Sequence, residues 1–226
     1  MPNELLWLIF LLFDLSIVIL AFRLWGRYGL YAMIAASVII CNIQVIALVK
    51  LFGLIATLGN IVYASIFLST DILSECYGKR EARRGVWIGF FCLIWASLAM
   101  QFAIIFIPDQ ADEMMPHLRE VFGLMPRVAL ASMIAYLVSQ NHDIWAFHFW
   151  REKTGGKWLW LRNNLSTLVS QLIDSVTFVL IAFAGIHSGR VLIQLIVTTY
   201  LFKLIVAAVD TPFIYIASII KNTGKK

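Results

Sequence analysis

The chain has 226 residues, of which 61% are hydrophobic and only 14% are charged, and its mean hydropathy is +0.85. This balance excludes an ordinary soluble domain and predicts an integral membrane protein. The formal net charge of +5 comes from basic residues between the apolar segments, so we do not interpret it as a nucleic-acid-binding surface.

Apolar segments follow one another along the whole chain, without a linker between them. A membrane-spanning helix needs roughly 20 mostly apolar residues. We expect such helices at residues 5–22, 29–49, 51–69, 86–107, 127–149, 164–186 and 191–220. The second and third would be joined by a tight turn at residues 50–53. The sequence therefore predicts a single integral membrane domain over residues 1–226, an all-α polytopic bundle of six or seven helices.

The basic residues indicate an orientation, because Lys and Arg concentrate on the cytoplasmic side of a membrane protein. With seven helices and the N-terminus outside, the cytoplasmic segments hold Arg23, Arg27, Lys79, Arg80, Arg83, Arg84, Arg151, Lys153, Lys157, Arg162, Lys221, Lys225 and Lys226. The outer segments hold only Lys50, Arg119, Arg127 and Arg190. We therefore expect the N-terminus outside and the C-terminus in the cytoplasm, with residues 108–126 forming an acidic, solvated outer loop.

The third expected helix leads into a charged stretch, STDILSECYGKREARR (residues 69–84). Asp71 and Glu75 are four residues apart and would share one helix face. The helix dipole disfavours carboxylates near a helix C-terminus, so they need a cation or a ligand nearby. Lys79, four residues after Glu75, is the structural alternative, and a role in coupling stays equally open.

Polar residues recur inside the fifth and sixth expected helices. Arg127 opens the fifth behind a proline, and Gln140 and Asp143 lie about four turns deeper. In the sixth, at 100° per residue, one stripe contains Asn164, Thr167, Ser170 or Gln171, Asp174 and Phe178. Such a continuous polar face is costly against lipid, so we expect it to face the interior of the bundle.

The last expected helix carries a lysine and an aspartate within its apolar sequence. Lys203 and Asp210 are seven residues apart, on one helix face, with Tyr200 close to Lys203. Pro212 predicts a kink. One explanation for all these groups is mutual pairing, for example of Asp174 with Lys203 and of Asp143 with Arg127. The other is a ligand rich in hydrogen-bond donors, because carboxylates and amides outnumber the buried cations.

Several other functions lack their sequence signals. The three cysteines form no CxxC pair, no zinc-binding spacing is present, and GGKW lacks the first glycine and the Ser or Thr of a phosphate-binding loop. Protease motifs are also absent from the sequence. A retinal-binding protein with Lys203 as Schiff base is an alternative, although Thr199 stands where such proteins have an acid. We therefore expect neither an enzyme nor a cofactor or metal.

Four blocks of the sequence resemble a known family in the same order and spacing. They are STDILSECYGKREARR, PRVALASMIAYLVSQNHD, LWLRNNLSTLVSQLIDSVTF and LIVTTYLFKLIVAAVDTPF, within residues 33–220. They are similar to the queuosine precursor transporters of the vitamin uptake transporter family. Because members commonly have six helices, residues 1–28 would be an additional N-terminal helix and residues 29–220 the transporter core. The resemblance also implies similarity to the substrate-binding subunits of energy-coupling factor transporters.

The resemblance implies import of 7-deazaguanines, such as preQ0 and preQ1, or of queuine across a bacterial plasma membrane. A carboxylate can accept both N–H groups on the guanine-like edge of such a base, and an amide can donate to its carbonyl. We expect Asp174 to take that edge, Gln171 and Gln140 to add polar contacts, and Phe178, Tyr136 or Tyr200 to stack on the ring. Asp143, Asn164 and Ser170 complete the expected site.

The energy source is not predicted by the sequence. Asp71, Glu75, Arg127, Lys203 and Asp210 are candidates for coupling or for structural pairing. The chain could act alone as a facilitator, couple to protons, or need a partner ATPase module. A homodimer is also open, whereas a nucleic-acid partner is not expected.

Overall fold

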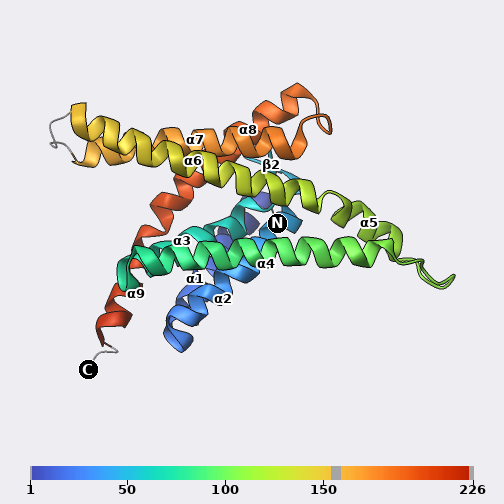
Figure 1. The fold of residues 1–226 in the computed structure, drawn as a ribbon, viewed down its shortest axis with the longest axis horizontal. Coiled ribbons are helices and arrows are strands. Elements are labelled where there is room, and N and C mark those ends of the chain that lie inside the picture. Colours follow the sequence, from blue (N-terminus) through green and yellow to red (C-terminus); the bar gives the residue numbers. More distant parts are fainter. Residues whose placement is uncertain (1, 154–158, 224–226) are drawn as a thin grey trace. The chain divides into compact units, whose positions relative to one another are not determined.

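The structure is a computed structural model that describes residues 2–153 and 159–223 (Figure 1). The elements are α1 (Asn3–Trp25), α2 (Arg27–Gln44), β1 (Leu48–Leu51), β2 (Leu54–Thr57), α3 (Asn60–Tyr77), α4 (Lys79–Ile105), α5 (Met115–Gly123), α6 (Met125–Lys153), α7 (Leu159–Phe183), α8 (Gly189–Val209) and α9 (Thr211–Thr223). The prediction of a helical polytopic membrane protein is confirmed.

Within the described ranges, four helical stretches are long and apolar enough to cross a membrane. They are Asn3–Trp25, Lys79–Ile105, Met115–Ser139 and Gly189–Val206. The apolar part of α7, Leu168–Phe183, is shorter. The number of crossings and the orientation of the termini stay predictions.

The chain divides into two compact units. Unit 1 contains Met1–Pro126 and Leu201–Lys226, and unit 2 contains Arg127–Tyr200. Unit 1 thus holds α1 to α5, the two strands, the end of α8, and α9. Unit 2 holds α7 and most of α6 and α8. The single membrane domain expected over residues 1–226 stays a prediction.

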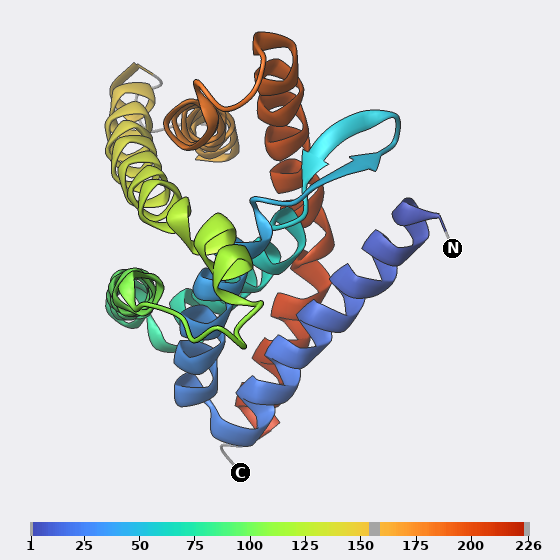
Figure 2. The ribbon, with the colours of Figure 1, turned by 90° about the vertical axis from the view of Figure 1, so that its right-hand side faces the viewer.

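The region expected to start the third helix is instead a β-hairpin (Figure 2). Strands β1 and β2 pair antiparallel, with Leu48 opposite Thr57 and Leu51 opposite Leu54. Phe52 and Gly53 both adopt positive φ angles, 51° and 80°, as the tight turn of a two-residue hairpin requires. The expected helix at residues 51–69 is therefore wrong in its first part, because this turn pairs the apolar segments on either side of it. Helix α3 begins only at Asn60.

The N-terminal helix is part of the core of unit 1. α1 packs against α2, α3 and α9. Its inward face is apolar and closely packed, and it comprises Trp7, Leu11, Leu15, Val18 and Phe22, all of them buried. In a membrane protein, such close side-chain packing replaces the hydrophobic effect as the force between helices. α1 is therefore an integral part of unit 1, and the expected division into an additional helix at residues 1–28 and a transporter core at residues 29–220 stays a prediction.

The packing of α2 against α1 requires a residue without a side chain in the first turn of α2. A Cβ atom on Gly29 would lie 2.2 Å from the carbonyl oxygen of Ala21. Nothing larger than glycine fits there without moving the backbone of α1 or α2. The close approach of the two helices thus depends on this one position.

The last apolar segment breaks where its sequence predicts a kink. α8 ends at Val209 and α9 starts at Thr211, with Asp210 between them and Pro212 in the first turn of α9. A proline lacks the backbone N–H that a continuing helix needs, and it is tolerated in a first turn. The predicted kink is confirmed, and it isolates Asp210 at a helix junction.

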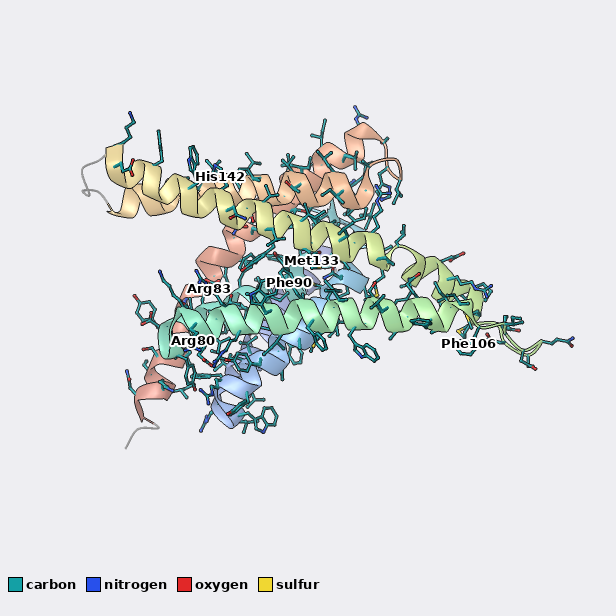
Figure 3. All side chains as sticks on the ribbon, in the orientation of Figure 1. Arg80, Arg83, Phe90, Phe106, Met133 and His142 are labelled. Carbon is teal, nitrogen blue, oxygen red and sulfur yellow. The ribbon has the colours of Figure 1, made fainter. Side chains whose placement is uncertain are left out.

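The outer loop expected at residues 108–126 contains the short helix α5. Arg119 on α5 donates hydrogen bonds to the carbonyl oxygens of Ile104 and Phe106, at 3.0 Å and 3.2 Å. Gln101 of α4 donates to the carbonyl oxygen of Phe122 at 2.7 Å. These bonds fasten α5 to the C-terminal end of α4, where Phe106 is labelled in Figure 3.

Candidate substrate-binding site

The polar stripe predicted for α7 is buried within unit 2. Ser170 is 5% exposed and Asp174 is 8% exposed, although both belong to an apolar helix. Ser139 of α6 donates a hydrogen bond to Oδ1 of Asp174 at 3.3 Å. The carboxylate therefore faces α6, as expected of a polar stripe turned away from lipid.

A histidine outside the predicted site joins this group. Nδ1 of His142 on α6, labelled in Figure 3, lies 3.0 Å from Oγ of Ser170 on α7. Ser139 and His142 are three residues apart on α6, and Ser170 and Asp174 are four apart on α7. Each pair thus shares a helix face, and the two faces meet. The i,i+3 spacing from Ser139 was the sequence signal that could have selected His142.

Gln171 contributes a buried acceptor to the same helix. Its side-chain Oε1 is buried and has no hydrogen-bond partner within the described ranges, while Ser175 donates to its backbone carbonyl at 2.8 Å. A buried amide oxygen without a donor is costly. It is therefore a natural acceptor for an N–H group of a ligand.

The aromatic residues expected to stack on a ligand are half-buried. Phe178 packs edge-on against Phe183, with ring centroids 6.1 Å apart and an interplanar angle of 88°. The backbone carbonyl of Tyr136 accepts a hydrogen bond from Ser139 at 3.2 Å, and Tyr200 lies near the middle of α8. The side chains of Gln140, Asp143 and Asn164 lie outside the described residues, so their predicted roles are not tested.

Arg127 holds the end of α7. Its Nε donates to the carbonyl oxygen of Ile181 at 2.7 Å, and its guanidinium also donates to the carbonyl oxygen of Ala184. The last carbonyl groups of a helix lack partners within the helix and attract a positive charge. Arg127 therefore binds backbone at a helix C-terminus, and its expected pairing with Asp143 stays a prediction because the side chain of Asp143 lies outside the described residues.

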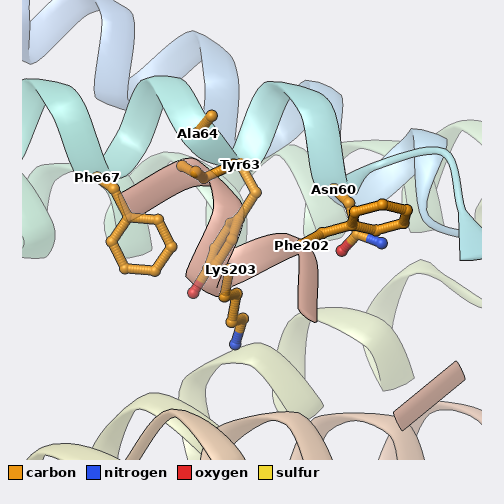
Figure 4. Close-up of a pocket in the computed structure, with 7 residues that line it drawn as sticks. Asn60, Tyr63, Ala64, Phe67, Phe202 and Lys203 are labelled. Atoms are coloured by element: carbon orange, nitrogen blue, oxygen red, sulfur yellow. The ribbon is translucent and has the colours of Figure 1, made fainter. Parts of the chain in front are cut away.

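Unit 1 contains a second polar and aromatic group, around a small pocket (Figure 4). Its lining comes from α3 and α8 and comprises Asn60, Tyr63, Ala64, Phe67, Phe202, Lys203 and Val206. Nζ of Lys203 lies 5.2 Å from the ring centroid of Tyr63, a cation–π contact. Tyr63 in turn packs edge-on against Phe67, at 4.8 Å. Lys203, only 7% exposed, is thus a structural part of this pocket, and its expected pairing with Asp174 stays a prediction.

The acidic residues of α3 and of the junction between α8 and α9 occupy different surroundings. Asp71 and Glu75 are exposed on α3, whereas Asp210 is 3% exposed at the junction of α8 and α9. Asp71 is close enough to Asp210 for their carboxylates to repel each other. Glu75 and Lys79 are on different helices, because α3 ends at Tyr77 and Gly78 turns the chain with a φ of 90°. The i,i+4 pairing considered for them is therefore wrong.

A family model described as "Putative vitamin uptake transporter" matches residues 57–217. The chain belongs to the vitamin uptake transporter family. The match to this transporter family covers α3 to α8 and most of α9, and it contains every predicted site residue from Asp71 to Asp210.

Three curated relatives carry the name of queuosine precursor transporter. The transporter is 39% identical to "Probable queuosine precursor transporter" of Bacillus subtilis (strain 168), over 96% of this chain and 95% of the relative. It is 27% identical to the protein of that name from Haemophilus influenzae (strain ATCC 51907 / DSM 11121 / KW20 / Rd), over 70% and 66%. It is 29% identical to "Queuosine precursor transporter" of Escherichia coli (strain K12), over 60% and 58%. No solved structure matches.

The comparisons confirm the resemblance and extend it at the N-terminus. Because the Bacillus subtilis alignment covers 96% of this chain, it includes most of α1. The four blocks that carry the resemblance do not include this helix, whereas the structure packs it into the core of unit 1. Membership of the family assigns the chain to membrane transport.

Proposed function

We propose that this transporter imports queuosine precursors, 7-deazaguanine bases, across the plasma membrane of a bacterium. The observation that carries the proposal is the buried pairing of Ser139 with Asp174 on facing helices, beside the buried oxygen of Gln171. The names of the three relatives support the same class of substrate.

The chemistry of the α6–α7 group fits the guanine-like edge of such a base. That edge presents an N1–H and an exocyclic amine side by side, and one carboxylate can accept both in a bidentate pair. Asp174 supplies the carboxylate, and Ser139 orients it through Oδ1. Gln171 supplies a further acceptor, and Ser170, held by His142, supplies a hydroxyl.

Specificity would follow from desolvation at this site. A buried site built to hydrogen-bond a ligand rejects an analogue that lacks the matching groups, because its own polar atoms are then left unpaired. A 7-deazaadenine, which presents an acceptor where guanine has N1–H, would face the carboxylate of Asp174 with a lone pair. We therefore expect guanine-type bases to be selected over adenine-type bases.

The test uses a bacterial host that cannot make preQ0 and lacks its own importer. The chain is expressed, preQ0, preQ1 or queuine is supplied at limiting concentration, and queuosine in tRNA is measured by boronate gel shift. We expect modification with the wild type and none with Asp174→Asn, which keeps the shape of the side chain but loses one acceptor. Asp112→Asn, an exposed position in the outer loop, is the matched control and should behave as the wild type.

The two levels of the proposal fail separately. No modification with any precursor, despite membrane expression of the wild type, would refute the import of queuosine precursors by this chain alone. Full modification by Asp174→Asn would leave the function standing and refute the assignment of the site.

A further inference from the structure

α1 carries a carboxyl group in the middle of an otherwise apolar helix, and the proposed substrate site makes no use of it. Asp14 is 8% exposed, and its neighbours on the same helix face, Leu11, Leu15 and Val18, are fully buried. A charged carboxylate at the centre of a membrane helix costs roughly 2.5–3.5 kcal/mol on insertion scales. An ionisable residue at this position is therefore a candidate for a functional role.

The surroundings of Asp14 suit a neutral acid. Ser65 of α3, which is fully buried, donates a hydrogen bond to Oδ2 of Asp14. Among the residues that the structure describes, no basic side chain forms an ion pair with Asp14. An ionised carboxylate offers about four acceptor sites, so hydrogen bonding from Ser65 alone leaves acceptor sites unmet away from water. The packing around Asp14 thus accommodates the carboxyl group with its proton in place.

The ionisable groups on the elements that pack against α1 bear on whether Asp14 keeps its proton. α1 packs against α2, α3, α9 and β1. From α2, the buried thiol of Cys41 interacts electrostatically with Asp14. The charged side chains of these elements are Arg27, Lys50, Asp71, Glu75 and Lys221, and α8, whose Phe202 stacks on Trp7 of α1, adds the buried Lys203. Among the described residues, no ion pair therefore stabilises the ionised form of Asp14.

Asp14 is connected to the pocket of unit 1 through both helices that it joins. Trp7, two turns earlier on the same face of α1, stacks on Phe202 with ring centroids 5.2 Å apart, and Phe202 lines the pocket. Ser65 lies in the turn of α3 that supplies Tyr63 and Phe67 to the same pocket. Loss of the proton would place an uncompensated charge between α1 and α3. The proton on Asp14 therefore favours the packing that shapes this pocket.

We propose that Asp14 is the proton-binding residue that couples transport by this protein to a proton gradient. The carboxyl group takes up a proton from the side of higher proton concentration. It stays neutral while the bound substrate is carried across the membrane, and it releases the proton on the other side. One proton thus moves with each substrate molecule in the same direction. This inference rests on the proposed function, because the substrate is a queuosine precursor.

The test uses the full chain, purified and reconstituted in liposomes. The substrate is preQ0, which has no basic amine and so does not redistribute passively with pH. Counterflow, the exchange of labelled external for unlabelled internal preQ0 without a gradient, measures substrate binding and translocation alone. Accumulation with an acidic exterior measures coupling. For one proton per substrate, a pH difference of one unit sustains up to about tenfold accumulation.

We expect wild type and Asp14→Glu to show counterflow and several-fold accumulation that disappears when a protonophore collapses the gradient. Asp14→Asn should keep counterflow but reach only equal concentrations inside and outside, because the amide cannot exchange a proton. A second readout is the infrared carbonyl band of a protonated carboxyl group, which we expect in the wild type and not in Asp14→Asn. Asp112→Asn should match the wild type in all these assays.

The outcomes separate the two proposals. Counterflow by the wild type without any response to the gradient would overturn the coupling role and leave the proposed function intact. Equal accumulation by Asp14→Asn and by the wild type would have the same meaning. Absence of counterflow in the wild type would refute the proposed function and the inference with it. If Asp14→Asn does not fold, the wild type alone tests the proposal. Accumulation together with an infrared band that is lost only on alkaline titration would support the proposal. An infrared band that never titrates would overturn it.

Discussion

Replacing Arg127 should weaken unit 2 by releasing the C-terminal end of α7. Arg127→Met keeps the aliphatic part of the side chain but removes both hydrogen bonds, to the carbonyl oxygens of Ile181 and Ala184. A hydrogen bond from a charged donor contributes about 1.5–3 kcal/mol, and less when it is exposed. The bond to Ile181 is partly buried and the bond to Ala184 is exposed. We therefore expect the free energy of unfolding to fall by about 2 kcal/mol.

Thermal unfolding in detergent, followed by intrinsic tryptophan fluorescence, measures this effect. For a chain of this length, 1 kcal/mol shifts Tm by about 2–4 °C, so Arg127→Met should lower Tm by about 4–8 °C. Arg119→Met is the matched control, because Arg119 also donates to two carbonyl oxygens beyond its own helix, those of Ile104 and Phe106. Unlike the bond from Arg127 to Ile181, both of these bonds are exposed. It should lower Tm by about 2 °C or less. Equal shifts for the two variants would refute the reasoning that burial makes the Arg127 contact stronger.

Three further predictions concern packing and the site. Gly29→Ala should abolish the monodisperse peak in fluorescence-detected size exclusion, because its Cβ would meet the carbonyl of Ala21, whereas Gly123→Ala, with open space around it, should leave the peak unchanged. A double-mutant cycle of Trp7→Leu and Phe202→Leu should give a coupling of about 0.5–1.5 kcal/mol in thermal unfolding, because the two rings stack; additive effects would contradict a direct contact. Ser139→Ala should raise the preQ0 concentration needed for half-maximal tRNA modification by about 2- to 10-fold, because one hydrogen bond to Asp174 is lost. An unchanged half-maximal concentration would show that Ser139 does not orient the carboxylate.

Local patterns predicted many elements correctly, because helix formation in lipid follows from apolar length. The helix at residues 5–22 lies within α1, and the break at Pro212 falls between α8 and α9. The buried stripe of α7 was also readable, since polar side chains at helical spacing in an apolar segment must face other helices. The hairpin at residues 48–57 was not, because its apolar residues are equally compatible with a helix until the turn at Gly53 pairs them.

The partners of the polar residues depended on contacts far apart in the chain. Arg127 was paired with an acid on charge alone, yet it binds the end of a helix that begins more than thirty residues later. His142 had no signal of its own beyond its spacing from Ser139, and only the approach of α6 to α7 places it on Ser170. Asp14 lay outside the recognised blocks, and its burial against Ser65 appears only when α1 packs on α3.

The amino-acid sequence by itself determined that this protein is a helical membrane protein of the vitamin uptake transporter family, because composition and apolar length decide what a bilayer accepts. It also determined which segments carry polar groups that must be hidden from lipid. Only the tertiary structure decided what each of those groups touches: Asp174 meets Ser139, Arg127 meets backbone carbonyls, and Asp14 meets Ser65. The physical reason is that the cost of burying a polar group is a property of the residue, whereas the partner that offsets this cost is a property of the packing.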